Sequence, residues 1–289
     1  MAASLNPYIS QFAEEFDAEK SQQYRMTIQF SLGGLSYALL DTGTKTLIAL
    51  ECFHSDLLAD SYDLFRTLER SLESKGLNTR AFQSVTCLVD NRICTLVPEP
   101  LFNEADQAKH LDFAFQLPEG HIIVSEPVPS AQCHFVFAFP KSLKDMASAK
   151  WKEVRLTHAS RVFIEDMMNN ATETCVRVQV RNRDFDMAIK KDGKLYFFNN
   201  FRFNTKEDFA YFLLFAMEQN GISGQDTPVC FSGLIRPASE IIDLCGRYVS
   251  DIRFVEDTHT LRVSKALEEV PFPYFFIHYQ GLGHNAQVC

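Results

Sequence analysis

The chain has 289 residues, of which 46% are hydrophobic and 22% are charged, and its formal net charge is −9. This composition excludes a disordered or fibrous protein, and the length allows two domains of ordinary size, each with a buried core. The acidic balance repels phosphate backbones, so we do not expect nucleic acid as a partner.

The amino-terminal residues 1–23 are largely polar and acidic, and we expect them to form an arm or a short helix. They have neither the basic start nor the apolar core of a signal peptide. The best apolar window, Phe209–Met217, is too short to span a membrane. The eight cysteines include no CxxC pair, which indicates free thiols in a reducing compartment. Together these features predict a cytoplasmic protein without a membrane span.

The first half of the chain predicts a meander of three strands followed by a helix. Alternating apolar residues place the strands at 26–32, 35–40 and 46–53, and the spacing of a helix face lies at 62–72. Two further strands, 85–89 and 93–97, are expected to form a hairpin about Asp90-Asn91. The remaining elements of this half are a helix at 104–116 and strands at 121–125 and 134–139.

The second half predicts the same order of elements. Its expected strands are 176–180, 185–189, 195–201 and 229–231, with a helix at 205–220 before the last strand. The turn Asp192-Gly193 between the second and third strands is a strong hairpin signal. We expect the apolar run 271–277 to pack as a terminal strand or staple, and an exposed partner-binding patch is the alternative.

A shift of 150 residues superimposes the two patterns. It places Ile28 on Val178 and Gly43 on Gly193. Any two meanders share a period of two, so alternation alone explains part of the match. The shared turn glycine and the same order of elements favour an internal duplication. We therefore predict three regions: an arm at 1–23, a first half at 24–172, and a second half with a carboxy-terminal tail at 173–289.

Four short phrases accompany this order of elements: VRLTHAS at 154–160, FDMAI at 185–189, FSGLIRP at 231–237 and LVPEPLF at 96–102. Together they resemble the actin-like ATPases, which include actin, the Hsp70 ATPase domain, sugar kinases and the FtsA- and PilM-type scaffolds. The last phrase and the whole layout resemble more closely an uncharacterised bacterial family assigned to this fold. The resemblance implies an α/β protein with a duplicated actin-like ATPase (ribonuclease H-like) fold, in which two halves of mixed β-sheet with flanking helices surround a cleft.

Each half of that fold contributes a D-x-G hairpin loop to a nucleotide site. The glycines admit the phosphates, and the aspartate holds hydrated Mg²⁺. In this chain the first loop, 29–34, has no carboxylate. The second loop has Gln179 at the aspartate position and Arg181–Asp184 where the glycines belong, and Ala159 stands where a connector Glu is common. The resemblance therefore implies a degenerate site, a pseudo-ATPase, with ATP and Mg²⁺ disfavoured as cofactors.

The positions that remain of such a nucleotide site are Gly33, Gly34, Ser232 and Gly233. A structural explanation stands beside the functional one for each glycine. A hairpin needs glycine at Gly33-Gly34 for positive φ alone. A glycine such as Gly233 also serves for close packing or for entry into a helix.

Arg181 and Arg183 form a second candidate site, because guanidinium groups bind phosphate or carboxylate as a fork. The alternative is an exposed turn whose charges pair with Asp184 or Asp186. Near the carboxyl terminus, the spacing of His278, His284 and Cys289 fits no standard site, so no metal is predicted.

No set of residues in the sequence predicts catalysis. The leading hypothesis is a non-catalytic cytoplasmic scaffold or adaptor that binds an unidentified protein partner. One alternative is a divergent ATP-binding protein or kinase, which would need a Mg²⁺-binding carboxylate in the cleft. The other is a sensor of a small anionic ligand that uses Arg181 or Arg183.

Overall fold

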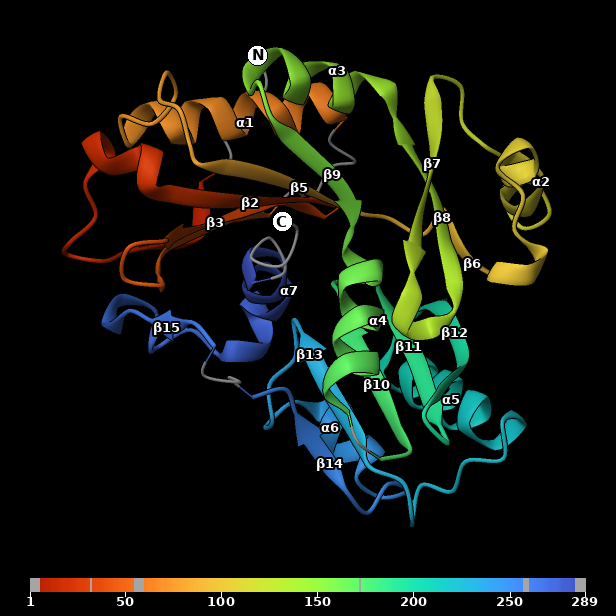
Figure 1. The fold of residues 1–289 in the computed structure, drawn as a ribbon. Coiled ribbons are helices and arrows are strands. Elements are labelled where there is room, and N and C mark those ends of the chain that lie inside the picture. Colours follow the sequence, from red (N-terminus) through yellow and green to blue (C-terminus); the bar gives the residue numbers. More distant parts are fainter. Residues whose placement is uncertain (1–5, 32, 55–59, 172, 257–259, 284–289) are drawn as a thin grey trace.

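The computed structural model describes residues 6–31, 33–54, 60–171, 173–256 and 260–283. They form two sheets of mixed strand direction, one built mainly from the first half of the chain and one from the second, and a smaller antiparallel sheet that projects from the first half (Figure 1). His284 and Cys289, two of the three residues weighed as metal ligands, lie outside the described residues.

The first sheet has the order β1-β4-β3-β2-β5-β9, and β15 also pairs with β4. Its strands are β1 (Pro7–Phe12), β2 (Tyr24–Ser31), β3 (Gly34–Asp41), β4 (Thr46–His54), β5 (Ser84–Asp90), β9 (Val154–His158) and β15 (Arg262–Val263). The expected amino-terminal arm thus supplies an edge strand, β1, and a 3₁₀ helix at Ala18–Gln23.

Side chains of the first sheet alternate between two faces, as period-two strands require. Ile28 and Tyr37 belong to the core that helix α1 (Ser61–Ser74) covers. Ala38 and Leu40 belong to a separate core that helix α7 (Phe272–Gly283) covers on the other face. A helix therefore packs on each face of this sheet.

The smaller sheet is inserted between β5 and β9 and has the order β6-β8-β7. Its elements are β6 (Cys94–Pro98), α2 (Gln107–Asp112), β7 (His121–Val128) and β8 (Cys133–Pro140), and α3 (Lys141–Lys150) leads from it to β9. The prediction that residues 85–89 and 93–97 pair as a hairpin was wrong. β5 lies inside the first sheet between β2 and β9, so both of its edges are occupied, and β6 pairs with β8 instead.

The second sheet has the order β12-β11-β10-β13-β14. Its strands are β10 (Cys175–Val180), β11 (Asp184–Lys191), β12 (Lys194–Arg202), β13 (Val229–Gly233) and β14 (Ile252–Phe254), with helices α5 (Lys206–Gln219) and α6 (Glu240–Cys245). Helix α4 (Ala159–Asn170) enters this half from β9, and α7 returns from it to the first sheet.

Strand pairing follows the same register in both halves. Ile28 pairs with Tyr37, and the residues 150 positions later, Val178 and Met187, pair with each other. The ladder to the third strand shifts register after Leu39 in one half and after Ile189 in the other, which is again the same offset.

Residues 271–277 pack against the rest of the chain, as the expected staple would, but they do so as part of a helix, so the expectations of a terminal strand and of an exposed patch were wrong. These residues begin α7, which is buried on several sides. Phe275, Tyr279 and Leu282 face one core and Phe276 and Ile277 face the other. A segment that is apolar all round suits a helix between two cores, because no face needs to meet water.

Candidate functional site

Two hairpin loops occupy equivalent places in the two halves. Ser31 pairs with Gly34 at the first loop, and its hydroxyl donates to the Gly34 carbonyl over 3.1 Å. At the second loop, 150 positions later, the Arg181 N–H donates to the Asp184 carbonyl over 2.9 Å. In each half the two paired residues that flank the loop are therefore three positions apart in the sequence.

Only one of the two predicted glycines of the first loop stands at a position that requires glycine. Gly34 has φ of +141°, and a Cβ there would lie 2.0 Å from the Phe53 carbonyl oxygen. A Cβ at Gly33 would meet nothing within 4 Å. Close approach to β4 therefore requires glycine at position 34 and leaves position 33 open.

Arg181 is the centre of a buried ionic cluster, and its side chain is only 12% exposed. Its Nη1 and Nη2 donate to the two carboxylate oxygens of Asp186 over 2.9 and 2.7 Å. Its Nε donates to Asp184. Nη1 also lies 3.1 Å from Asp90 Oδ1, at the end of β5. Arg181 therefore joins the second loop to the first sheet.

Asp186 receives hydrogen bonds from three other residues. Besides Arg181, Asn200 Nδ2 donates to Oδ1 over 2.7 Å, and the Ser160 hydroxyl donates to Oδ2. Arg92 donates from Nε to the Asn200 side-chain oxygen. Burial opposes ionisation of Asp186, but the charge and hydrogen bonds of Arg181, with those of Asn200 and Ser160, lower its pKa. The carboxylate is charged at neutral pH.

Asp90 and His158 are two further buried groups of this junction, and their pKa values shift in opposite directions. Burial raises the pKa of Asp90 to about 6, and the nearby Asp186 adds to that rise, while Arg181 and the Gln29 amide oppose it. His158 ends β9, and its Nδ1 accepts the Ser160 N–H over 3.1 Å. Burial lowers the pKa of His158 to about 3, so the imidazole is neutral.

The structure places the other predicted positions at the base of the second loop or at its tip. The Ser232 hydroxyl donates to Gln179 Oε1. A Cβ at Gly233, where φ is +86°, would lie 2.0 Å from the Val180 carbonyl oxygen. Gly233 thus serves close packing of β13 on β10. Arg183 is exposed, and only Arg181 of the two arginines enters the cluster.

Sequence reasoning missed the roles of Asp90 and Ser160, and it gave Asp186 no role beyond an alternative ion pair. Asp90 was placed in a turn, although a carboxylate at the end of a buried strand is itself a signal. Asp186 stands inside the apolar run Phe185–Ile189, which marks a buried charge that needs a partner. No group of three or more His, Cys, Asp or Glu residues in the described ranges is arranged to hold a metal ion.

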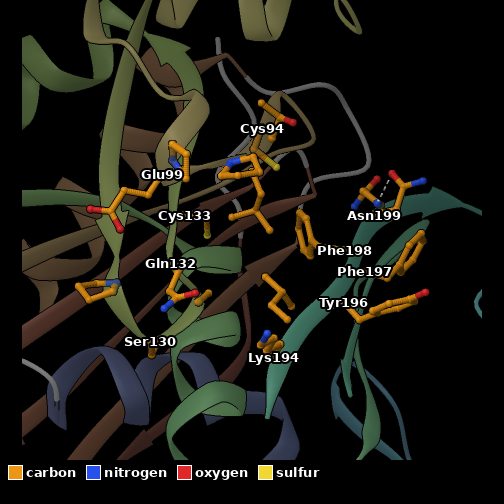
Figure 2. Close-up of a pocket in the computed structure, with 18 of the residues that line it drawn as sticks. Cys94, Glu99, Ser130, Gln132, Cys133, Lys194, Tyr196, Phe197, Phe198 and Asn199 are labelled. Atoms are coloured by element: carbon orange, nitrogen blue, oxygen red, sulfur yellow. Dashed lines mark hydrogen bonds between the residues drawn. The ribbon is translucent and has the colours of Figure 1, made fainter. Parts of the chain in front are cut away.

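A groove of about 1460 Å³ lies between the inserted sheet and β12. Figure 2 shows its walls, with Cys94, Glu99 and Gln132 on one side and Tyr196 and Phe197 on the other. The Phe198 ring lies 6.0 Å from the Phe135 ring, so the two walls meet through aromatic contact. The lining residues are Arg92, Cys94–Leu96, Pro98–Pro100, Ala114, Phe115, Pro129–Cys133 and Asp192–Asn200.

Comparison with known proteins gives the fold a family context. A family model described as "Protein of unknown function (DUF3822)" matches residues 13–252. No curated protein matches the sequence. A Bacteroides thetaiotaomicron VPI-5482 protein with an actin-like ATPase fold and unknown function is similar in structure, with a TM-score of 0.72 and 18% identity over 83% of this chain and 93% of that chain.

A second similar structure is the PilM-PilN type IV pilus biogenesis complex, with a TM-score of 0.64 and 10% identity over 92% of this chain and 99% of that chain. These similarities confirm the predicted α/β actin-like ATPase fold. In the part of the chain that the structure describes, no helix has both the length and the apolar character needed to cross a membrane.

Proposed function

The chain belongs to the family of unknown function DUF3822, and from that premise we propose that it is a non-catalytic scaffold or adaptor, a pseudo-ATPase that keeps the actin-like fold without the nucleotide chemistry. The Arg181 cluster carries this proposal. The guanidinium lies among Asp90, Asp184 and Asp186, where it neutralises carboxylates that would otherwise be candidates for Mg²⁺.

Mg-ATP would have to displace this cluster to reach the loops. A bound triphosphate needs backbone N–H donors and a carboxylate for its hydrated metal ion. Arg181 is held by bidentate pairing, and Asp186 already accepts bonds from Arg181, Asn200 and Ser160. Breaking a buried ion pair by removing one partner costs roughly 3–5 kcal/mol. This cost would reduce the free energy available for nucleotide binding.

A scaffold role also draws support from the fold. A PilM with this fold occurs in a complex with PilN, so such a chain can hold a protein partner. The seven cysteines in the described ranges are free thiols, which supports a cytoplasmic location. The shared register of the two meanders supports an internal duplication, with halves at 24–172 and 173–289.

Thermal unfolding with millimolar ATP and Mg²⁺ tests the proposal, beside ADP and sulfate as controls. A ligand at 100 times its dissociation constant stabilises a fold by about 2.7 kcal/mol, which moves a melting curve visibly. We expect no nucleotide-specific shift. An upward shift that chelation of Mg²⁺ abolishes would overturn the proposal in favour of an ATP-binding protein or kinase.

A shift with sulfate alone would favour the small-anion sensor. Arg183 is the exposed arginine of the second loop, so Arg183→Ala should remove such a shift. The same variant should leave the midpoint without added anion unchanged.

A further inference from the structure

We propose that the outer edge of β12 binds an extended, acidic peptide segment of a partner protein, which adds to the second sheet as a further strand. This inference names the class of partner for the scaffold proposed above and rests on that proposal. It depends on the strand edges, the groove beside them and the distribution of charge.

The two sheets end differently at equivalent strands. β4 is the third strand of the first meander, and the chain itself covers its outer edge with β1, which pairs antiparallel, and with β15. β12 is the third strand of the second meander. Among the described residues β12 pairs with β11 alone. The first half thus shows how a short antiparallel strand completes such an edge.

The backbone of β12 offers hydrogen bonds on its outer side. The Asn200 N–H donates to the Asn199 side-chain oxygen over 2.9 Å and is therefore not used in the ladder with β11. In an antiparallel pair the N–H and C=O groups face the partner strand at every second residue. The backbone groups of Phe198 therefore share the outward direction.

The groove beside this edge suits a peptide better than a small molecule. Its volume of about 1460 Å³ exceeds the roughly 300–1,000 Å³ typical of small-molecule sites. Its opposite wall includes β6, which is also an edge strand and pairs with β8 alone among the described residues. Half-buried Leu96, Leu195 and Phe198 line it. An added strand would place apolar residues at every second position against them.

The charges at the two ends of β12 favour an acidic peptide over a second copy of this chain. Lys194 and Arg202 are exposed at the two ends of β12. Arg92 donates from Nε to Asn200 on β12, and burial and the charge of Arg202 lower its pKa. A second copy pairing antiparallel about Phe198 would bring Lys194 beside Arg202 of the other copy, and like charges on facing strands repel.

The groove lining also carries two negative charges. Glu99 follows β6 on the opposite wall, and Asp192 lies in the turn between β11 and β12. The positive charges nearest β12 are therefore Lys194 and Arg202 at its two ends and Arg92, which donates to Asn200. A strand that carries Asp or Glu beside the ends of β12 would be attracted, whereas self-association would be opposed.

A random dodecapeptide library panned against the whole chain tests this inference. We expect enrichment of peptides with apolar residues at alternate positions and Asp or Glu between them. Hydrogen exchange with a synthetic enriched peptide should show new protection in β12. N-methylation of alternate backbone nitrogens of the peptide should abolish binding in one register only, since only one set of N–H groups faces β12.

The double variant Lys194→Glu/Arg202→Glu should weaken the enriched peptide roughly tenfold, because two exposed charge pairs become repulsive. Lys144→Glu/Lys152→Glu is the matched control, with the same change in net charge at exposed positions outside the groove lining. Both variants should keep the unfolding midpoint of the parent chain.

Absence of enrichment, enrichment without alternation or acidic residues, or equal weakening by the two double variants would each overturn this inference. If those results come with no nucleotide-dependent melting shift, the scaffold proposal stands and only the β12 site fails. A Mg²⁺-dependent nucleotide shift would overturn the scaffold proposal itself, and the role of this edge with it.

Discussion

The two halves attach a crossing helix to their sheets at the same register positions but with different chemistry. In the first half, Thr27 and Ser36 contact the two ring nitrogens of His278 on α7 over 2.8 and 2.7 Å. The residues 150 positions later are Arg177, which lies 3.4 Å from Asp166 on α4, and Asp186, which accepts from Ser160.

The difference shows what each half contributes to the whole. The first sheet is joined to α7 by neutral groups, and β1 and β15 cover its outer edge. The second sheet is joined to α4 by buried charges, and Arg181, which pairs with Asp186, also reaches Asp90 on the first sheet. The second sheet also leaves the edge of β12 uncovered among the described residues. The buried charges of the second half therefore tie the two sheets together, and its uncovered edge is the one for which we propose a peptide partner.

The largest expected effect is that of Arg181→Leu. It leaves Asp186 and Asp90 buried without their cation, so the free energy of unfolding should fall by roughly 3–5 kcal/mol. Urea unfolding measures this. Ser31→Ala, at the equivalent position of the first loop, should cost at most about 1 kcal/mol. Equal losses at the two positions would show that the loops do not differ as the contacts indicate.

Deleting residues 1–12 removes β1 and makes the first sheet resemble the second at its edge. The half-buried Ile9 and Phe12 lose their contacts, and Ser10 no longer donates to Glu51 over 2.6 Å. We expect a loss of about 2–3 kcal/mol in urea unfolding. A truncated chain with the parent's stability would mean that β1 covers the edge without stabilising it.

Gly34→Ala tests the close approach of the first loop to β4. The added Cβ meets the Phe53 carbonyl oxygen, and φ of +141° suits only glycine, so we expect a loss of about 1–3 kcal/mol. Gly33→Ala, one residue earlier, meets open space and should change stability by less than about 0.5 kcal/mol. Thermal melting of the pair measures the difference, and a reversed order would contradict the described turn.

Lowering the pH should reduce the free energy of unfolding, because the contact of α7 with the first sheet depends on a neutral His278. Burial lowers the pKa of His278 and of His158 to about 3, whereas the unfolded chain takes up these protons near pH 6.5. Stability therefore falls as pH drops from about 6.5 towards 3, by up to about 1.4 kcal/mol per pH unit for each histidine. The pKa of Asp90 is raised to about 6, so the folded chain takes up this proton more readily than the unfolded chain. Between about pH 6 and 4 its contribution to stability therefore rises as pH falls and cancels that of one histidine.

His278→Gln removes the contribution of one of the two histidines to the pH dependence of stability. From these three groups, the parent chain should lose about 1.4 kcal/mol per pH unit between pH 6 and 4, and the variant should be nearly flat. Urea unfolding across this range measures both. An unchanged slope in the variant would show that the imidazole of His278 takes up its proton in the folded chain as readily as in the unfolded one.

Local patterns predicted most of the strands and helices. Alternating apolar residues placed β2, β3, β4, β10 and β11, and Asp192-Gly193 predicted the turn before β12. The shift of 150 residues anticipated the shared pairing register, since a meander is specified by residues close in sequence. The fold class and the family resemblance followed from this order of elements.

Only the tertiary structure decided the partners of segments that lie far apart in the chain. β6 pairs with β8 instead of β5, and residues 272–283 form a helix because two cores surround them. The sequence determined that the second loop carries arginine where its fold family has glycine. Whether that arginine meets solvent, a ligand or Asp90 depends on how the two sheets approach each other, and no local pattern records that approach.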